Sequence, residues 1–431
     1  LRYLPVRKVH ARQVLDSRGN PTVEAEVTVG EGIVGINGYT GRAMVPSGAS
    51  TGKFEAVELR DGNREEYLGQ SVKKAVENIN TRLADAIIGE NALNQAWIDH
   101  LLIETDGTEN KSKLGGNSIY SVSIAVFRAA AASAGKELYE YIAGEKIKTV
   151  PVPSFNVING GKNGNIVQPF NEFIVMPYKA KDIYDAVETG VKVFEQLPKT
   201  IRKRFGVEPQ VGRSFGWVAP SEDPEEILET IMQAAEECGC KEKIALSIDC
   251  ASSEMYDTES GTYLLKGKRI SADELIAYAK YLSEKFNFVF IEDLLDENDW
   301  DAFPKAVSEI TRTNIIGDDF IVTNPKRIKK AYEMKGISGF ILKPNQVGTI
   351  TEALETYDFA KEHNLLAITS GRSGGVIDDV VMDLAVGLQI GFIKNGAPRS
   401  GERIEKLNFL MRACDLSEDC KMADISDVIK F

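Results

Sequence analysis

The chain has 431 residues, with 51 Lys or Arg against 64 Asp or Glu, so its formal net charge is −13. Hydrophobic residues make up 43% and charged residues 27%, which is typical of globular proteins and excludes disorder and small disulfide scaffolds. The acidic balance argues against nucleic acid and anionic membrane partners, because both are bound chiefly by clustered Lys and Arg.

Cysteine usage indicates a reducing compartment. The five cysteines are an odd number in a long chain, and neither a signal peptide nor an apolar run of 18 residues is visible, so we expect a cytoplasmic protein. Cys238 and Cys240 are one residue apart and could contribute to a soft-metal site. Because no group of Cys or His partners lies nearby, a surface turn is favoured.

The N-terminal third predicts an α+β cap domain over residues 1–143. The first 60 residues alternate apolar and polar side chains, as in Thr22–Thr28, with Gly-rich turns between, which predicts an antiparallel sheet. From about Glu65 to Ile142 the apolar residues recur with a period of 3.6, so helices are expected to follow the sheet.

Residues 144–431 show the rhythm of a (β/α) barrel. A short apolar run repeatedly ends in a polar residue and leads into an amphipathic helix. The runs are Ile244–Asp249, Phe288–Glu292, Asn314–Asp318, Phe340–Lys343, Leu365–Ser370 and Ile390–Lys394. Their spacing matches βα units of about 25 to 30 residues. The longest interval leaves room for an inserted hairpin around Leu264–Lys268.

The ends of these runs predict an oxygen-lined metal site. In a barrel the C-terminal strand ends converge on one face, so Asp249, Glu292, Asp318, Lys343 and Lys394 should share one mouth. A single Asp at a strand end is more often a helix N-cap. Three carboxylates at close range repel one another unless a cation joins them, and oxygen-only ligands favour Mg²⁺ over zinc.

The two lysines differ from ordinary surface lysines. Most Lys residues are solvated charges, but Lys343 and Lys394 follow apolar strand runs and should point into the barrel or its mouth. Divalent cations and a second ammonium favour the neutral amine, which can serve as a general base. Lowering a Lys pKa from ~10.4 to near 7 requires roughly 4 to 5 kcal/mol of environmental bias.

Long motifs then resemble the enolase (phosphopyruvate hydratase) family, and the resemblance runs from about Val9 to Lys406. The motifs are Ala11–Glu24, Val45–Gly52, Asn110–Asn117, Asp249–Glu254, Val322–Arg327 and Lys343–Gly348. The resemblance implies an α+β N-terminal cap and a modified (β/α)8 TIM-type barrel of the enolase superfamily, with partly antiparallel first strands. It also implies a glycolytic lyase that interconverts 2-phosphoglycerate and phosphoenolpyruvate, a small phosphorylated substrate, and a homodimer or higher homo-oligomer.

The resemblance also assigns the metal ligands. Asp249, Glu292 and Asp318 match the ligands of a first Mg²⁺, and Ser50 matches a ligand of a second Mg²⁺ that binds with substrate.

The resemblance further assigns the residues that contact substrate. Lys343 matches the base that removes the proton beside the carboxylate, and Lys394 matches the lysine that binds that carboxylate. Arg372 and Ser373 match the pair that holds the phosphate, where a planar donor fork suits the group. Glu172 matches a catalytic acid of the family's pocket that also contacts substrate, and Asn163 takes the place of another substrate-binding residue.

The residues that would help the hydroxide to leave differ from the family. Asn163 and Gly371 stand where enolases have histidines, and Gly212–Trp217 lacks the second acidic residue of the motif Gly-Asp-Glu-Gly-Gly-Phe. Lys162 and Arg213 lie within these altered segments. The three histidines of the chain, His10, His100 and His363, fall outside the family motifs.

Three interpretations therefore stay open. The first is an enolase-type lyase acting on 2-phosphoglycerate or a close relative. The second is an enzyme of the same fold for another phosphorylated or phosphonylated acid, with Arg213 binding an added anionic group; alternatively, Lys162 and Arg213 face solvent. The third is a non-catalytic paralogue, against which the presence of Lys343 argues.

Overall fold

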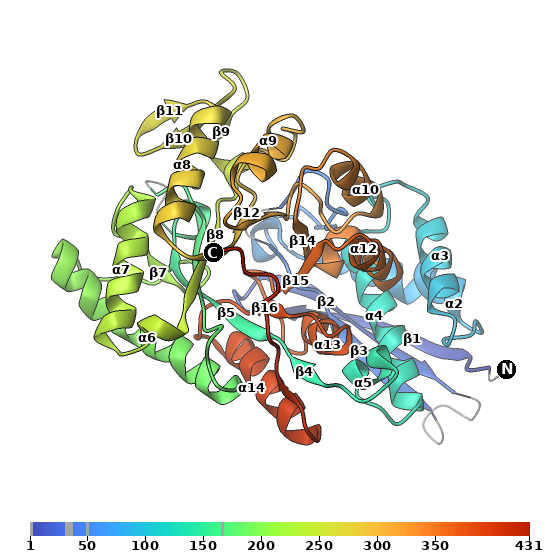
Figure 1. The fold of residues 1–431 in the computed structure, drawn as a ribbon. Coiled ribbons are helices and arrows are strands. Elements are labelled where there is room, and N and C mark those ends of the chain that lie inside the picture. The colour runs from blue at the N-terminus through green and yellow to red at the C-terminus, as the bar shows by residue number, and fades with distance from the viewer. Residues whose placement is uncertain (1–2, 31–37, 49–50, 165–167) are drawn as a thin grey trace.

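The computed structural model describes residues 3–30, 38–48, 51–164 and 168–431 (Figure 1). The chain opens with an antiparallel sheet of β1 (Val6–Leu15), β2 (Pro21–Val29) and β3 (Tyr39–Met44), in that order. The helix α4 (Gly116–Ser133) packs on this sheet. At Gly41 a Cβ would lie 2.0 Å from the carbonyl oxygen of Ala125, so only glycine permits this approach.

The remaining cap helices pack on the same sheet or on the helices beside it. They are α1 (Lys73–Asn78), the π-helical turn Ile79–Leu83, α2 (Ala84–Ile87), α3 (Gln95–Asp106) and α5 (Leu138–Ala143). The predicted order of a sheet followed by helices is thus confirmed.

The second part of the chain is a closed barrel of eight strands. These strands are β5 (Val152–Asn159), β6 (Glu172–Met176), β8 (Ala245–Asp249), β12 (Phe288–Glu292), β13 (Asn314–Gly317), β14 (Gly339–Leu342), β15 (Leu366–Ser370) and β16 (Phe392–Lys394). The pairing of β16 with β5 closes the ring. β6 runs antiparallel to both β5 and β8, and the other neighbouring pairs are parallel, so the barrel is of the modified type that was predicted.

Helices surround the barrel. They are α6 (Ile183–Phe205), α7 (Pro224–Glu237), α8 (Ala272–Lys285), α9 (Ala302–Glu309), α10 (Pro325–Glu333), α11 (Pro344–Val347), α12 (Ile350–Glu362), α13 (Val380–Gly387) and α14 (Gly401–Leu416).

Short strands complete the structure. They are β4 (Thr149–Val150), β7 (Trp217–Val218), β9 (Tyr256–Asp257), β10 (Thr262–Leu265), β11 (Lys268–Ile270) and β17 (Lys421–Met422). The pairing of β10 with β11 forms the predicted inserted hairpin.

The Cys238–Cys240 segment forms the turn after α7. Gly239 adopts φ +73°, a conformation that favours glycine, and both thiols donate to backbone carbonyls. Cys240 is buried, so the segment is less exposed than a simple surface turn. Neither cysteine belongs to a group of three potential metal ligands among the described residues.

Candidate active site

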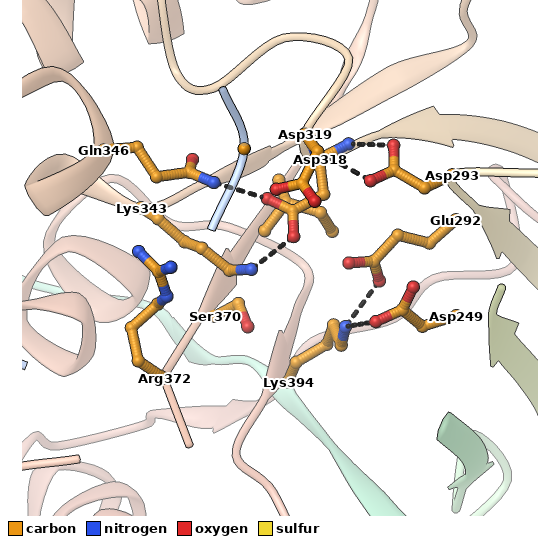
Figure 2. A network of polar contacts seen from close by, with 12 residues as sticks. Asp249, Glu292, Asp293, Asp318, Asp319, Lys343, Gln346, Ser370, Arg372 and Lys394 are labelled. Carbon is orange, nitrogen blue, oxygen red and sulfur yellow. Dashed lines mark hydrogen bonds and ion pairs between the residues drawn. The ribbon is translucent and has the colours of Figure 1, made fainter. Parts of the chain in front are cut away.

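The C-terminal ends of the barrel strands bring the predicted charged residues to one mouth (Figure 2). Asp249, Glu292 and Lys394 are the last residues of β8, β12 and β16, and Asp318 and Lys343 directly follow β13 and β14. All five side chains are buried. The convergence expected from strand spacing is therefore present.

Lys394 lies among three carboxylates. Its Nζ is 2.5 Å from Glu292 Oε2, 3.2 Å from Glu172 Oε2 and 3.6 Å from Asp249 Oδ2. The antiparallel pairing of β6 with β8 places Glu172 directly opposite Asp249, which is how a residue from a reversed strand reaches the mouth. Lys394 thus balances part of the charge of an acidic cluster.

Lys343 occupies the facing side of the mouth. Its ammonium forms an ion pair with Asp318, whose Oδ1 accepts a hydrogen bond from Gln346 Nε2 at 2.8 Å. Its backbone amide donates to Thr323 Oγ1 at 2.9 Å. The side chain is therefore fixed at both ends, beside a predicted metal ligand.

The electrostatics of the mouth follow from burial and crowding of like charges. Burial, together with the charges of Glu172 and Asp318, raises the pKa of Asp249 to about 6. Burial and the neighbouring carboxylates also raise the pKa of Glu292 well above its usual value. Carboxylates crowded in this way are stabilised as anions by an added cation.

The lysines respond in the opposite sense. Burial opposes the charged form of both, but the surrounding carboxylates raise the pKa of Lys394 well above its usual value, and Asp318 raises that of Lys343. Burial alone would raise the pKa of Asp318, yet Lys343 and Lys394 lower it. Paired with Asp318 in this way, Lys343 is held in its charged form.

The donor set fits a divalent cation. The ligands are oxygens of buried carboxylates, and Glu292 Oε1 has no hydrogen-bond partner within the described part of the chain. Among the described residues, the group of three carboxylates within 4.8 Å of one another is Asp293, Asp318 and Asp319, which shares only Asp318 with the predicted set. In this structure Glu292 forms an ion pair with Lys394, and Asp318 forms one with Lys343.

Sequence reasoning missed Asp293. Its two carboxylate oxygens accept hydrogen bonds from the backbone amides of Asp318 and Asp319, at 2.8 and 2.7 Å (Figure 2). These bonds orient the turn that carries Asp318. The signal available in the sequence was that two of the three predicted ligands are each followed by a second acid, in Glu292-Asp293 and Asp318-Asp319.

The predicted phosphate-binding residues lie at the contact between cap and barrel. Arg372 donates from Nη1 and Nη2 to Glu55 of the cap at 3.2 and 3.0 Å. The hydroxyl of Ser373 accepts from Arg18 Nη1 at 3.2 Å, so a second cap residue reaches the same place. A phosphate at Arg372 would have to share or replace the contact with Glu55.

Two of the predicted site residues lie wholly or partly outside the described part of the chain. Ser50 lies outside the described residues, and so does the side chain of Asn163, whose backbone belongs to a short turn, Gly161–Asn163.

The cations of the altered segments point outward. Arg213 is exposed, and Lys162, 57% exposed, lies 3.3 Å from Glu254. This placement agrees with the solvent-facing interpretation and gives Arg213 no place in the lining of the cavity beside Lys394. The neighbouring Ser214 lines that cavity instead, and sequence reasoning did not single it out.

Comparisons with known proteins agree across the chain. Residues 6–142 match the model of the enolase N-terminal domain, and residues 147–428 match that of the enolase C-terminal TIM barrel domain. Two relatives named Enolase, from Methanococcus maripaludis strains S2 / LL and C5, are each 43% identical over 408 residues, which cover 94% of this chain and 94% of theirs. None of the described helices has the length and apolar character needed to cross a membrane.

Proposed function

The chain belongs to the enolase family, the hydro-lyases of the phosphopyruvate hydratase type, and we propose that it dehydrates 2-phosphoglycerate to phosphoenolpyruvate with Mg²⁺. The observation that carries this proposal is the set of two lysines and three carboxylates buried together at the barrel mouth. Burying an ammonium group costs free energy even when it is paired with a carboxylate, so two buried lysines at strand ends support a functional role.

In this proposal Lys343 removes the α-proton and Lys394 binds the substrate carboxylate. Asp249, Glu292 and Asp318 would hold one Mg²⁺, and Ser50 would bind a second that arrives with substrate. Bound Mg²⁺ stabilises the charge of the enolised carboxylate. A Lys base combined with one or two Mg²⁺ is the known pattern of the enolase superfamily itself and is not a result of this structure.

Arg372 and Ser373 would bind the substrate phosphate. Arg372 carries a planar guanidinium, which suits bidentate recognition, and its present partner Glu55 comes from the cap. Binding of phosphate would therefore change a contact between the cap and the barrel.

A different phosphorylated or phosphonylated acid is the second candidate substrate. The observation that favours it is the altered segment around Ser214 together with Gly371. We would compare kcat/KM for 2-phosphoglycerate with that for a panel of such acids, using wild type and Arg213→Gln. Because Arg213 is exposed, the substitution should not change the preference among substrates.

The experiment that tests the proposed function follows two signals at once. The protein is incubated with Mg²⁺ and 2-phosphoglycerate in D₂O, while phosphoenolpyruvate absorbance and loss of the α-proton signal are recorded. We expect both, and neither when the metal is chelated. Failure to see either signal with folded, Mg²⁺-loaded protein would contradict the proposal and favour a non-catalytic paralogue.

Three further expectations remain proposals. They are a cytoplasmic location, a homodimer or higher homo-oligomer, and a boundary between cap and barrel at residues 143 and 144.

A further inference from the structure

A small polar cavity lies beside Lys394 and Glu172. Its volume is about 40 Å³, and one buried water needs roughly 10 to 15 Å³, so it has room for two or three water-sized groups. It is lined by residues of β5, β6, β15, β16, α14 and the loop that carries Ser214.

The lining of this cavity has unsatisfied polar atoms. Four of its side chains are at least 97% buried and carry an oxygen with no hydrogen-bond partner among the described residues: Ser154 Oγ, Asn156 Oδ1, Ser214 Oγ and Asn395 Oδ1. An unpaired buried polar atom costs about 1 to 3 kcal/mol, so four in one cavity indicate that a polar ligand completes them. Hydroxyl and amide oxygens suit a hydroxyl group or a water molecule.

Lys406, the second lysine in the lining of this cavity, lies against the position that a side chain of residue 371 would take. Gly371 carries no side chain, and a Cβ there would lie 3.2 Å from Cε and 3.7 Å from Nζ of Lys406. Lys406 is 3% exposed and its Nζ lies 2.5 Å from Glu402 Oε2. The end of the Lys406 side chain therefore packs against the space that a side chain at residue 371 would occupy, next to Arg372.

Lys406 also has a route to solvent. It lines a second cavity of about 420 Å³ between the cap and helices α13 and α14, and the rim of that cavity includes the exposed residues Arg42, Lys136 and Asp378. A proton lost toward the small cavity can be replaced from this side.

Aromatic residues hold the loop that carries Ser214 in place. The Arg403 guanidinium lies 4.8 Å from the centre of the Phe215 ring, and Trp217 stacks on Phe194 and donates from Nε1 to its carbonyl oxygen at 3.0 Å. Because Arg403 and Lys406 both belong to α14, the loop and the ammonium are positioned by one helix.

We propose that this cavity is the leaving-group pocket and that Lys406 is the proton donor to the departing hydroxyl group. This inference rests on the proposed function. It assigns to Lys406 the task of the second acid, which the described residues of the altered segments do not supply. Glu172 also lines the cavity, but it forms an ion pair with Lys394 at 3.2 Å. Ser214 and the three other unsatisfied side chains hold the hydroxyl group and then the water that it becomes.

The step balances with two lysines. After Lys343 has taken the α-proton, the electron pair left on the α-carbon forms the C=C bond as the C–O bond breaks. The departing oxygen takes one proton from the Lys406 ammonium and leaves as water. Lys406 regains a proton from solvent, and Lys343 releases one, so no other reactant is needed.

The test separates proton abstraction from elimination. With 2-phosphoglycerate and Mg²⁺ in D₂O, Lys406→Ala should lower phosphoenolpyruvate formation by about 10²- to 10⁴-fold, while α-proton exchange stays within about 3-fold of wild type. Glu402 keeps Arg403 as a partner in this variant, so the fold should survive. Adding Gly371→His to Lys406→Ala should restore at least about 10-fold of the lost elimination, because the vacated space accepts the imidazole.

Controls keep the outcomes distinct. Arg213→Gln, an exposed neighbour of Ser214, should change neither rate. Lys406→Arg keeps the positive charge, but a guanidinium is a far weaker acid than an ammonium. Elimination should therefore be slower than in wild type even when thermal unfolding shows that the variant is folded. Unchanged elimination in Lys406→Ala, or an equal loss of exchange and elimination, would overturn the proposal. Absence of both signals in wild type would overturn the proposed function and this inference with it.

Discussion

The two sides of the barrel mouth are built in different ways. The side that carries Lys343 and the predicted metal ligands uses residues at or next to strand ends, whose positions the barrel fixes. The side that carries Ser214 and Lys406 uses a loop and a helix. The predicted metal ligands and Lys343 match the family, whereas Gly212–Trp217 on the loop side and Gly371 after β15 depart from it. We infer that the two halves of the reaction can be altered separately.

The largest expected effect tests the strand-end side. Lys343→Ala should reduce α-proton exchange by at least about 10³-fold, because a positioned base contributes 10² to 10⁴ and no second amine forms an ion pair with Asp318 among the described residues. Exchange is followed by loss of the α-proton NMR signal in D₂O. Exchange at a rate near that of wild type would identify another residue as the base.

Asp318→Asn tests whether the same side holds the metal. Replacing one anionic ligand should weaken Mg²⁺ binding by at least about 100-fold, measured by calorimetry, since altered outer partners alone typically cost 10 to 100. Asp301→Asn, at an exposed position before α9, is the matched control. Equal affinity in the two variants would remove Asp318 from the metal site.

Asp99, a buried carboxylate outside the barrel mouth, tests separately how burial raises the pKa of an acid. Asp99 of α3 accepts from the amide of Thr351 at the start of α12 and from Gln95, and burial raises its pKa to about 6. Between pH 3.8 and about 6 the unfolded chain loses this proton while the folded protein keeps it, so stability falls as pH rises through that window.

Asp99→Asn should remove this loss of unfolding free energy with rising pH, which amounts to about 3 kcal/mol at most. The amide introduced at this position could donate to Gln95 Oε1, which has no partner among the described residues. Urea unfolding at pH 4 and pH 7 measures the difference, with the exposed Glu104→Gln on the same helix as control. A pH slope identical to that of wild type would show that Asp99 is ionised in the folded protein throughout this range.

The smallest expected effect tests the loop side. Phe215 adopts φ +68°, and Phe215→Ala keeps the conformational restriction of this position while removing the ring that contacts Arg403. We expect elimination to slow by about 10-fold, with exchange unchanged. The exposed Val211→Ala in the same loop serves as control. Slower exchange in Phe215→Ala would mean that the two sides are coupled.

The strand-end side was largely predictable from the sequence. The run Phe288–Glu292 coincides with β12, and Asp318 and Lys343 fall one residue beyond their strands, because apolar runs and their polar ends repeat at the βα interval. Asp293 could not be assigned its role, since the turn that brings two backbone amides to its carboxylate is a tertiary feature.

The loop side was not predictable, for a physical reason. A Lys in an amphipathic helix is normally solvated, and nothing in the periodicity of α14 marks Lys406 or Glu402 as buried. Both side chains can be buried because glycines far along the chain leave room for them. A Cβ at Gly375 would lie 2.4 Å from Glu402 Oε2, and a Cβ at Gly371 would lie 3.2 Å from Lys406 Cε. The presence of Gly371 showed only that an imidazole was missing.

One measurement tests the separation of the two sides most directly. Exchange and elimination of 2-phosphoglycerate are recorded in the same Mg²⁺-containing D₂O sample for wild type, Lys343→Ala and Lys406→Ala. We predict that Lys343→Ala loses both signals and that Lys406→Ala loses elimination while it retains exchange. If the two signals fall together in Lys406→Ala, or if elimination persists in that variant, the two sides of the mouth do not serve separate steps of the reaction.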